Sequence, residues 1–221
     1  MEKVKTINVK KTIFESNIND VISIRDKMKK EHTFFLNLMS GPGDGTTSLL
    51  KATVRSLKDE MKICVISASL FSDIDSQSII TAGADAVQLN TNNLSYLDAN
   101  MIKQVLDQVE YYKYDLLILD NIGDLINPAL HDVGANDNVV VISVSSGDDK
   151  PLKYPTIFMK SSTLVITKID VAPYFDFSLE KCISNATSCK KDINIIPLSA
   201  RTGEGLDSWV NYLRNKVSSV K

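Results

Sequence analysis

The chain has 221 residues, of which 43% are hydrophobic and 24% are charged, the ordinary balance of a globular protein with a buried core. Its 25 basic and 27 acidic residues give a net charge of −2, which argues against a protein that binds nucleic acid or an anionic membrane through its charge. The three cysteines include no C-x-x-C pair, which argues against a disulfide framework or a zinc ribbon.

The chain starts with polar sequence, and no apolar run approaches the roughly 20 residues of a membrane span. We therefore expect a cytoplasmic protein that contacts neither a membrane nor nucleic acid. A leading helix is predicted for residues 11–30, with Ile18, Val21 and Ile24 among its apolar positions. This helix ends just before the first predicted strand, so we divide the chain into an N-terminal helical extension, residues 1–32, and one domain, residues 33–221.

From residue 33 onward, short apolar runs alternate with amphipathic stretches. Strands are predicted at residues 34–39, 63–66, 116–119, 139–142, 164–166 and 193–198, and helices at 47–58, 75–82, 97–112, 179–188 and 206–217. Strands that are apolar almost throughout are typical of a parallel sheet covered on both faces. The alternation predicts a three-layer α/β domain with a mostly parallel sheet, in which ligands bind at the carboxyl ends of the strands.

A glycine-rich segment, residues 40–47, follows the first predicted strand and leads directly into a helix. Its glycines let backbone N–H groups turn toward a phosphate, and the N-terminus of the helix favours an anion. This is the layout of a P-loop, G-x-x-x-x-G-K-[ST]. We predict that the phosphates of a nucleotide are bound by Gly41, Gly43, Asp44, Gly45, Thr46, Thr47 and Ser48, with the Thr47 hydroxyl as a ligand of Mg²⁺.

Two positions of this loop depart from the P-loop pattern. Thr46 takes the place of the lysine that reaches the β- and γ-phosphates. A hydrogen bond to a charged group contributes about 1.5–3 kcal/mol, so its loss should weaken nucleotide binding about ten- to a hundred-fold. Asp44 adds a carboxylate that we expect to repel phosphate, and Lys51 lies too far down the helix to compensate.

Two further segments, each at the end of a predicted strand, indicate a guanine site. Residues 167–170 read T-K-x-D, a variant of N-K-x-D, in which the aspartate accepts hydrogen bonds from guanine N1–H and the 2-amino group. Residues 199–205 read S-A-R-T-G-E-G, in which a backbone N–H would meet guanine O6. We predict that the base of GTP or GDP is bound by Thr167, Lys168, Asp170, Ser199, Ala200 and Arg201, and that Asp120, at another strand end, holds Mg²⁺ directly or through water.

With these motifs, the chain resembles the family of GTPases that insert nickel during the maturation of hydrogenase and, in some organisms, urease. The resemblance runs from Asn37 to Trp209 and includes a long, specific run, D-K-P-L-K-Y-P, at residues 149–155. It implies a fold of the P-loop GTPase type and GTP hydrolysis as the family activity. It also implies a nucleotide-dependent homodimer that passes nickel to other hydrogenase-maturation proteins.

The resemblance also shows where this chain lacks the metal ligands of the family. The family has a Cys-His pair before Leu-Asp-Ala, a His after it and a Cys before Pro-Ala, where this chain has Ser95, Tyr96, Asn100 and Asn127. Neutral oxygens do not replace thiolate or imidazole for nickel or zinc, so we predict that this site is lost. An acidic E-G-D of the family reads Ser-Ala-Ser at residues 67–69, which removes a magnesium ligand.

Two functions stay open at this point. The first is a guanine-nucleotide-binding protein of nickel-centre assembly with weakened phosphate and metal sites. The second is a catalytically inactive GTPase-like scaffold that dimerises or binds other maturation proteins without transferring metal. The sequence leaves open whether GTP is hydrolysed. An ATP-using kinase is disfavoured, because the residues at 167–170 and 199–201 would then have no role.

Overall fold

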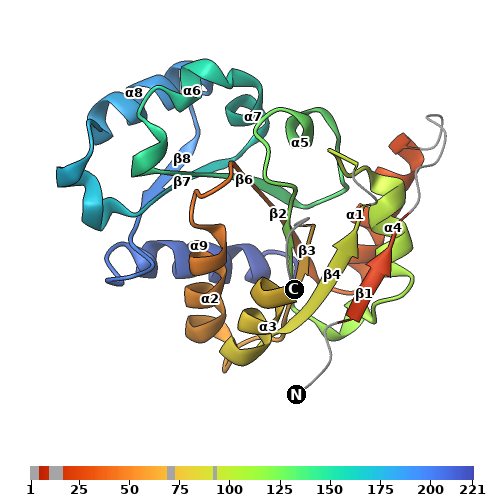
Figure 1. Cartoon of the computed structure of the whole chain (residues 1–221). Coiled ribbons are helices and arrows are strands. Elements are labelled where there is room, and N and C mark those ends of the chain that lie inside the picture. The colour runs from red at the N-terminus through yellow and green to blue at the C-terminus, as the bar shows by residue number, and fades with distance from the viewer. Residues whose placement is uncertain (1–4, 10–16, 69–72, 92–93) are drawn as a thin grey trace.

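A computed structural model describes residues 5–9, 17–68, 73–91 and 94–221 (Figure 1). The strands in this part of the chain are β1 (Lys5–Asn8), β2 (Phe34–Ser40), β3 (Ile63–Ser67), β4 (Asp85–Asn90), β5 (Leu116–Asp120), β6 (Asp137–Ser143), β7 (Thr163–Thr167) and β8 (Asn194–Pro197). The α-helices are α1 (Asn17–Lys30), α2 (Thr46–Leu57), α3 (Asp73–Ala82), α4 (Ala99–Leu106), α5 (Asn127–Leu130), α6 (Lys150–Lys153), α7 (Pro155–Lys160), α8 (Leu179–Cys189) and α9 (Leu206–Ser218). Three 3₁₀ helices are η2 (Tyr111–Lys113), η3 (Val144–Ser146) and η4 (Ile169–Tyr174).

The eight strands form one sheet in the order β1-β4-β3-β5-β2-β6-β7-β8, and every neighbouring pair is parallel. The predicted three-layer α/β fold is therefore confirmed. Strand β2 lies between β5 and β6, with Leu38 opposite both Asp120 and Val139. This order places the ends of β5, β2, β6 and β7 side by side, so the loops that follow them share one edge of the sheet.

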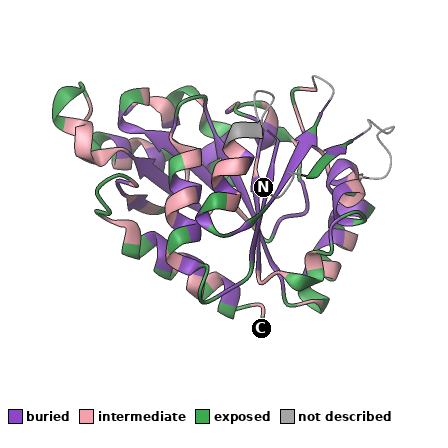
Figure 2. Cartoon of the chain, turned by 60° about the horizontal axis from the view of Figure 1, so that its bottom comes forward, coloured by how far each residue is buried: buried purple, intermediate pink, exposed green. Residues whose placement is uncertain are grey.

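Helices cover both faces of the sheet. Helices α2, α3 and α9 contribute to one core cluster, whereas α1 and α4, and further along α7 and α8, contribute to clusters on the opposite face. Figure 2 shows the strands as a buried layer between helices whose outer surfaces are exposed. This burial on both faces explains why the strand sequences are apolar almost throughout.

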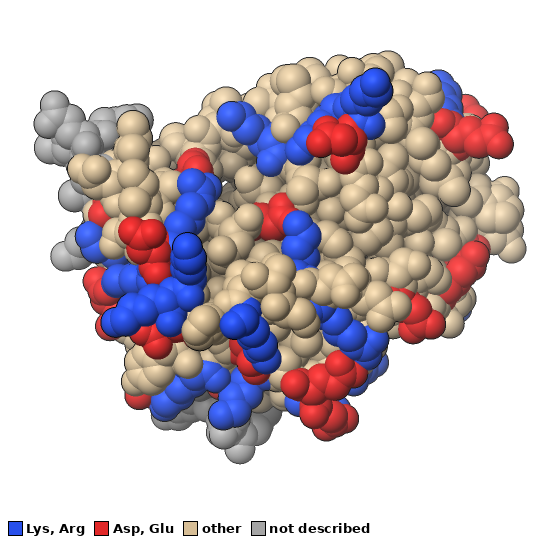
Figure 3. Space-filling view, turned by 180° about the vertical axis from the view of Figure 1, so that it is seen from behind, with Lys and Arg blue, Asp and Glu red and all other residues tan. Residues whose placement is uncertain are grey.

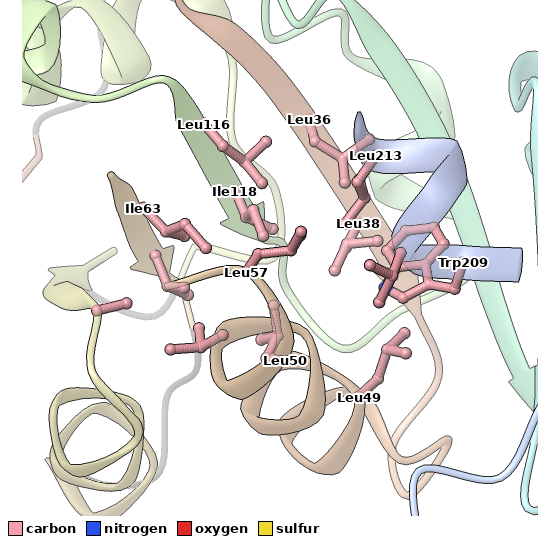
Figure 4. Close-up of a cluster of buried hydrophobic side chains, with 14 of the residues drawn as sticks. Leu36, Leu38, Leu49, Leu50, Leu57, Ile63, Leu116, Ile118, Trp209 and Leu213 are labelled. Atoms are coloured by element: carbon pink, nitrogen blue, oxygen red, sulfur yellow. The ribbon is translucent and has the colours of Figure 1, made fainter. Parts of the chain in front are cut away.

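Helix α2 shows how the amphipathic pattern directs a helix onto the sheet. Its buried residues, Leu49, Leu50, Thr53, Val54 and Leu57, recur at the spacing of one helical face. Figure 4 shows Leu49, Leu50 and Leu57 pointing toward Leu36 and Leu38 of β2 and toward Trp209 of α9. This packing fixes the start of α2, and with it the preceding glycine loop, against the centre of the sheet.

Two strands were missing from the sequence-based prediction. Strand β4 has only three apolar residues among polar ones, and β1 buries a single residue, Ile7, on the sheet edge beside β4. Neither segment carries the continuous apolar run by which the other strands were predicted. The predicted helix at 97–112 is also shorter, because α4 ends at Leu106 and is followed by turns and by η2.

The first 32 residues contain more than the predicted leading helix. Helix α1 is present from Asn17 to Lys30, whereas the predicted start at residues 11–16 lies outside the described residues. Strand β1 joins the same sheet as the domain, and Ile24 and Met28 of α1 are fully buried in its core. The division of the chain at residue 32 stays a prediction.

Basic and acidic side chains are interleaved on the face of the molecule that Figure 3 shows. Among the described residues, no helix has the length and apolar character that a bilayer crossing requires.

Candidate functional site

The glycine-rich loop lies between the end of β2 at Ser40 and the start of α2 at Thr46. Gly45 is the residue before the helix and has φ +87°, a conformation that favours glycine. A Cβ at Gly45 would lie 3.2 Å from Oγ1 of Thr167 at the end of β7. Glycine at this position therefore lets the loop pack closely against the T-K-x-D segment.

Two side chains of that segment hold the loop. Thr167 Oγ1 donates a hydrogen bond to the carbonyl of Asp44 at 2.6 Å, and Lys168 Nζ donates to the carbonyl of Gly43 at 2.6 Å. Lys168 has φ +61°, a left-handed conformation that is uncommon for a residue with a side chain and concentrates at functional sites. The structure thus joins two motifs that lie more than 120 residues apart in the chain.

A cavity of about 250 Å³ opens beside this junction. It is lined by Gly45, Ser48, Thr167, Lys168, Asp170, Val171, Ser199, Ala200 and Arg201. Every residue predicted to bind the base lines this cavity, and Val171 is the one lining residue that the sequence analysis missed. Ligand pockets usually measure about 300–1,000 Å³, so this cavity matches part of a ligand, such as a base, better than a whole nucleotide.

The S-A-R-T-G-E-G segment forms a tight turn at the cavity. Ser199 Oγ accepts hydrogen bonds from the N–H groups of Arg201 and Thr202, and the N–H of Gly203 donates to the carbonyl of Ser199. A Cβ at Gly205 would lie 2.2 Å from the carbonyl oxygen of Pro197, so only glycine fits there. The turn holds Ala200 at the cavity wall.

Asp170 is the acidic group of the cavity. Its side chain is half-buried at the start of η4 and, within the described part of the chain, makes no hydrogen bond or ion pair. A carboxylate accepts hydrogen bonds with both oxygens. The arrangement can therefore bind two adjacent donors on the edge of a flat ring, as guanine presents and adenine does not.

Asp44 differs from the expectation that its carboxylate would face a bound phosphate. The residue is only 1% exposed, and its carboxylate points into the protein toward the end of β6. Oδ2 accepts from the N–H of Gly41 at 2.8 Å, and Oδ1 accepts from the N–H and the hydroxyl of Ser143 at 3.0 and 3.1 Å and from the hydroxyl of Ser146. Sequence pattern carries no signal for the contacts with Ser143 and Ser146, because these residues lie about 100 residues away in the chain.

The two residues predicted to bind magnesium lie on neighbouring elements. Asp120 ends β5 and lies opposite Leu38 of β2, while Thr47 lies in the first turn of α2. Burial, with a smaller contribution from the carboxylate of Asp75, raises the pKa of Asp120 to about 7. A cation would relieve both effects, and carboxylate and hydroxyl oxygens are ligands that Mg²⁺ accepts. The residues present therefore fit magnesium.

The positions at which the family metal ligands are replaced form other contacts. The ring of Tyr96 stacks on His131 with centroids 4.3 Å apart, Asn100 donates to Asp20, and Asn127 donates to Asp124. No group of three His, Cys, Asp or Glu residues suited to a metal ion occurs within the described ranges. Ser69, the last residue of the Ser-Ala-Ser segment, lies outside them.

The chain matches known proteins along nearly its whole length. Residues 35–197 match the model of the CobW/HypB/UreG nucleotide-binding domain family. The hydrogenase maturation factor HypB of Escherichia coli K12 is 35% identical over 216 residues, which are 98% of this chain and 74% of that protein.

Solved structures agree with this match. The hydrogenase maturation factor HypB of Archaeoglobus fulgidus is 30% identical and superimposes with a TM-score of 0.87, covering 92% of this chain and 100% of that one. HypB of Helicobacter pylori, solved in complex with nickel, is 31% identical, with a TM-score of 0.86 and coverage of 93% and 96%.

Proposed function

Because this chain belongs to the CobW/HypB/UreG family of nucleotide-binding domains, we propose that it binds guanine nucleotide and serves nickel-centre assembly in hydrogenase maturation. The observation that carries the proposal is the convergence of two guanine-reading segments and the glycine loop on one cavity. A chance T-K-x-D would have no reason to lie against both the loop and the S-A-R-T-G-E-G turn.

Each side of the cavity has a distinct task in this proposal. Asp170 accepts from guanine N1–H and the 2-amino group, and the N–H of Ala200 meets O6. The stem of Lys168 packs against the base while its Nζ stays on the carbonyl of Gly43. This bond couples occupation of the base site to the shape of the phosphate loop.

The phosphates lie over the N-terminus of α2, where the first N–H groups have no intrahelical acceptor. Thr47 and Asp120 would hold Mg²⁺, which would neutralise phosphate charge. Thr46 supplies no cation for the charge that develops during phosphoryl transfer, so we propose binding rather than turnover as the task of this site.

Nickel is the metal with which one relative was solved. We propose that this chain does not hold nickel at Ser95, Tyr96 and Asn127, because these residues offer neither thiolate nor imidazole. Nickel titration by calorimetry tests this proposal with the natural chain and a Ser95→Ala, Asn127→Ala double variant. Stoichiometric nickel binding that disappears in the variant would contradict it.

The comparisons do not favour the alternative of an inactive scaffold, since the relatives that match along nearly the whole chain are hydrogenase maturation factors. Other maturation proteins are the proposed partners. The homodimer and the cytoplasmic location stay predictions.

The decisive experiment compares GDP with ADP by calorimetric titration. We expect GDP to bind at least about tenfold more tightly, because each hydrogen bond to a charged group contributes about 1.5–3 kcal/mol. Asp170→Asn should lower GDP affinity by about ten- to a hundred-fold and improve binding of xanthosine diphosphate, whose 2-oxygen accepts a hydrogen bond from an amide.

Asp176→Asn is the matched control, because Asp176 is exposed and does not line the cavity. It should leave the affinity for all three nucleotides unchanged. Equal binding of GDP and ADP to the natural chain would refute the proposed function.

A further inference from the structure

The glycine loop contains one side chain that can form a hydrogen bond. Between Ser40 and Thr46 the loop reads Gly-Pro-Gly-Asp-Gly, and the φ angles of Gly43 and Gly45 are +79° and +87°. Glycine loses more conformational freedom on ordering than any other residue. A loop of this composition therefore depends on contacts beyond its own backbone to keep a single conformation, and Asp44 is the residue whose side chain provides them.

The Asp44 carboxylate joins the loop to β6 and η3. Its Oδ1 accepts from the N–H and the hydroxyl of Ser143, at 3.0 and 3.1 Å, and from the hydroxyl of Ser146. Its Oδ2 accepts from the N–H of Gly41 at 2.8 Å, which closes the loop on itself. We call these four hydrogen bonds the Asp44 clamp. The residue is only 1% exposed, so water has almost no access to these bonds.

The clamp requires a group that accepts with both of its oxygens. Each oxygen of Asp44 has a backbone N–H among its donors, that of Gly41 on Oδ2 and that of Ser143 on Oδ1. A carboxylate accepts on both sides, whereas the amide of an asparagine carries hydrogens on one side. An amide at this position would therefore place its NH₂ group against one of the two backbone N–H groups, whichever way it turned.

The T-K-x-D segment holds the same loop from another strand. Thr167 Oγ1 donates to the carbonyl of Asp44, and Lys168 Nζ donates to that of Gly43. Both donors also line the base cavity. Residues 43 and 44 are thus held between β6 and β7 without a bound ligand, and the N-terminus of α2 begins two residues later.

We propose that Asp44 is a positioning residue whose clamp keeps the glycine loop in its phosphate-binding conformation before the nucleotide arrives. This inference rests on the proposed function. A ligand that meets a loop already in place does not have to order it, so less of the interaction free energy is lost on binding. The base contacts side chains of other segments, so loss of the clamp weakens binding of the phosphates more than binding of the base.

The test is a titration of guanosine and GDP into the natural chain and three variants. Asp44→Asn should lower GDP affinity about tenfold, equivalent to the ordering of roughly one residue, and should leave guanosine affinity within about twofold. Ser146→Ala removes one donor of the clamp and keeps the charge of Asp44, so GDP affinity should fall by about threefold.

Ser145→Ala is the matched control. Ser145 lies in the same 3₁₀ helix, and in the described structure its hydroxyl bonds that of Ser143 rather than the carboxylate. Both affinities should be unchanged in this variant. A side chain that acted only on overall stability would change guanosine and GDP binding by the same factor, so the difference between the two ligands identifies positioning.

Amide hydrogen exchange in the ligand-free protein gives a second readout. The N–H of Gly41, which donates to Asp44, should exchange slowly in the natural chain, and GDP should slow it further by less than about threefold. In Asp44→Asn this N–H should exchange at least about tenfold faster. If Asp44→Asn does not fold, Ser146→Ala and the exchange of Gly41 in the natural chain decide the question.

Three results would overturn the inference. The first is that Asp44→Asn binds GDP as tightly as the natural chain, or more tightly, as removal of a charge that repels phosphate would predict. The second is that Ser146→Ala binds GDP like Ser145→Ala, or loses guanosine and GDP affinity equally. The third is that Gly41 exchanges slowly only when GDP is bound.

These results are distinguishable from a failure of the proposed function. Guanosine that binds more tightly than adenosine, together with unchanged GDP affinity in Asp44→Asn and Ser146→Ala, would refute the clamp alone. Equal binding of guanosine and adenosine to the natural chain would refute the proposed function and this inference with it.

Discussion

At the residue scale, Asp120 shows how burial changes the chemistry of a side chain that the sequence identifies only as an acid at a strand end. Burial, with a smaller contribution from Asp75, raises its pKa to about 7 from an ordinary value of 3.8. Between these two values the native state binds a proton that the unfolded chain has released. The free energy of unfolding should therefore fall as pH rises through this window.

Asp120→Asn should remove this pH dependence. We expect the variant to be more stable than the natural chain at pH 8 by at most about 4 kcal/mol, and the difference to vanish near pH 4. Urea denaturation across this range measures it. Asp148→Asn is a control of opposite sign, because the hydrogen bond from Lys181 lowers the pKa of Asp148, so this variant should lose stability at neutral pH and not at low pH. If the free energy of unfolding depended on pH in the same way for Asp120→Asn and the natural chain, the raised pKa of Asp120 would be contradicted.

Lys168 is a second residue whose surroundings cannot be read from the sequence alone. The T-K-x-D pattern predicts a lysine that packs over a base, and Lys168 lines the cavity. The bond from its Nζ to the carbonyl of Gly43, and its left-handed backbone, depend on where the glycine loop lies. Neither is visible in the motif itself.

At the element scale, helix α1 connects the first residues to the domain core. Ile24 is fully buried beside Met28, whereas Ile18 on the same helix is 77% exposed. The sequence pattern predicts the helix, but it gives no reason to expect that Ile24 is more buried than Ile18. Only the packing of α1 against α4 distinguishes them.

The two isoleucines provide a matched pair of variants. Ile24→Ala should lower the free energy of unfolding by about 2–5 kcal/mol, because it leaves a cavity in the core. Ile18→Ala removes the same atoms from the same helix and should change it by less than about 0.5 kcal/mol. Chemical denaturation compares them, and similar losses at both positions would show that α1 does not pack as described.

The strands of this protein also differ in how well their sequences predict them. Strand β2 is buried along its whole length, and five of its seven residues are apolar, with only Asn37 and Ser40 polar. Strand β1 lies at the sheet edge, where only Ile7 of its four residues is buried. An edge strand with one buried side chain has neither an alternation nor a continuous run of apolar residues, so its sequence cannot be distinguished from that of a loop.

At the scale of the whole molecule, the site depends on the order of the strands. The glycine loop follows β2, Asp120 ends β5, and the T-K-x-D and S-A-R-T-G-E-G segments follow β7 and β8. Because all of these strands are parallel and neighbours in the order β5-β2-β6-β7-β8, segments from residue 40 to residue 205 meet at one edge.

The sequence alone predicted the α/β class, the glycine loop and all the residues that line the cavity except Val171, because buried parallel strands and glycine-rich turns leave local patterns of apolar residues and glycine. The tertiary structure decided the edge strands, the burial of Ile24 and the direction of the Asp44 carboxylate. These features depend on contacts between segments far apart in the chain: Ser143, which holds Asp44, is 99 residues away from it. A local pattern records which side chains are present, whereas the donors that surround a buried carboxylate are set by the packing of β6 beside β2.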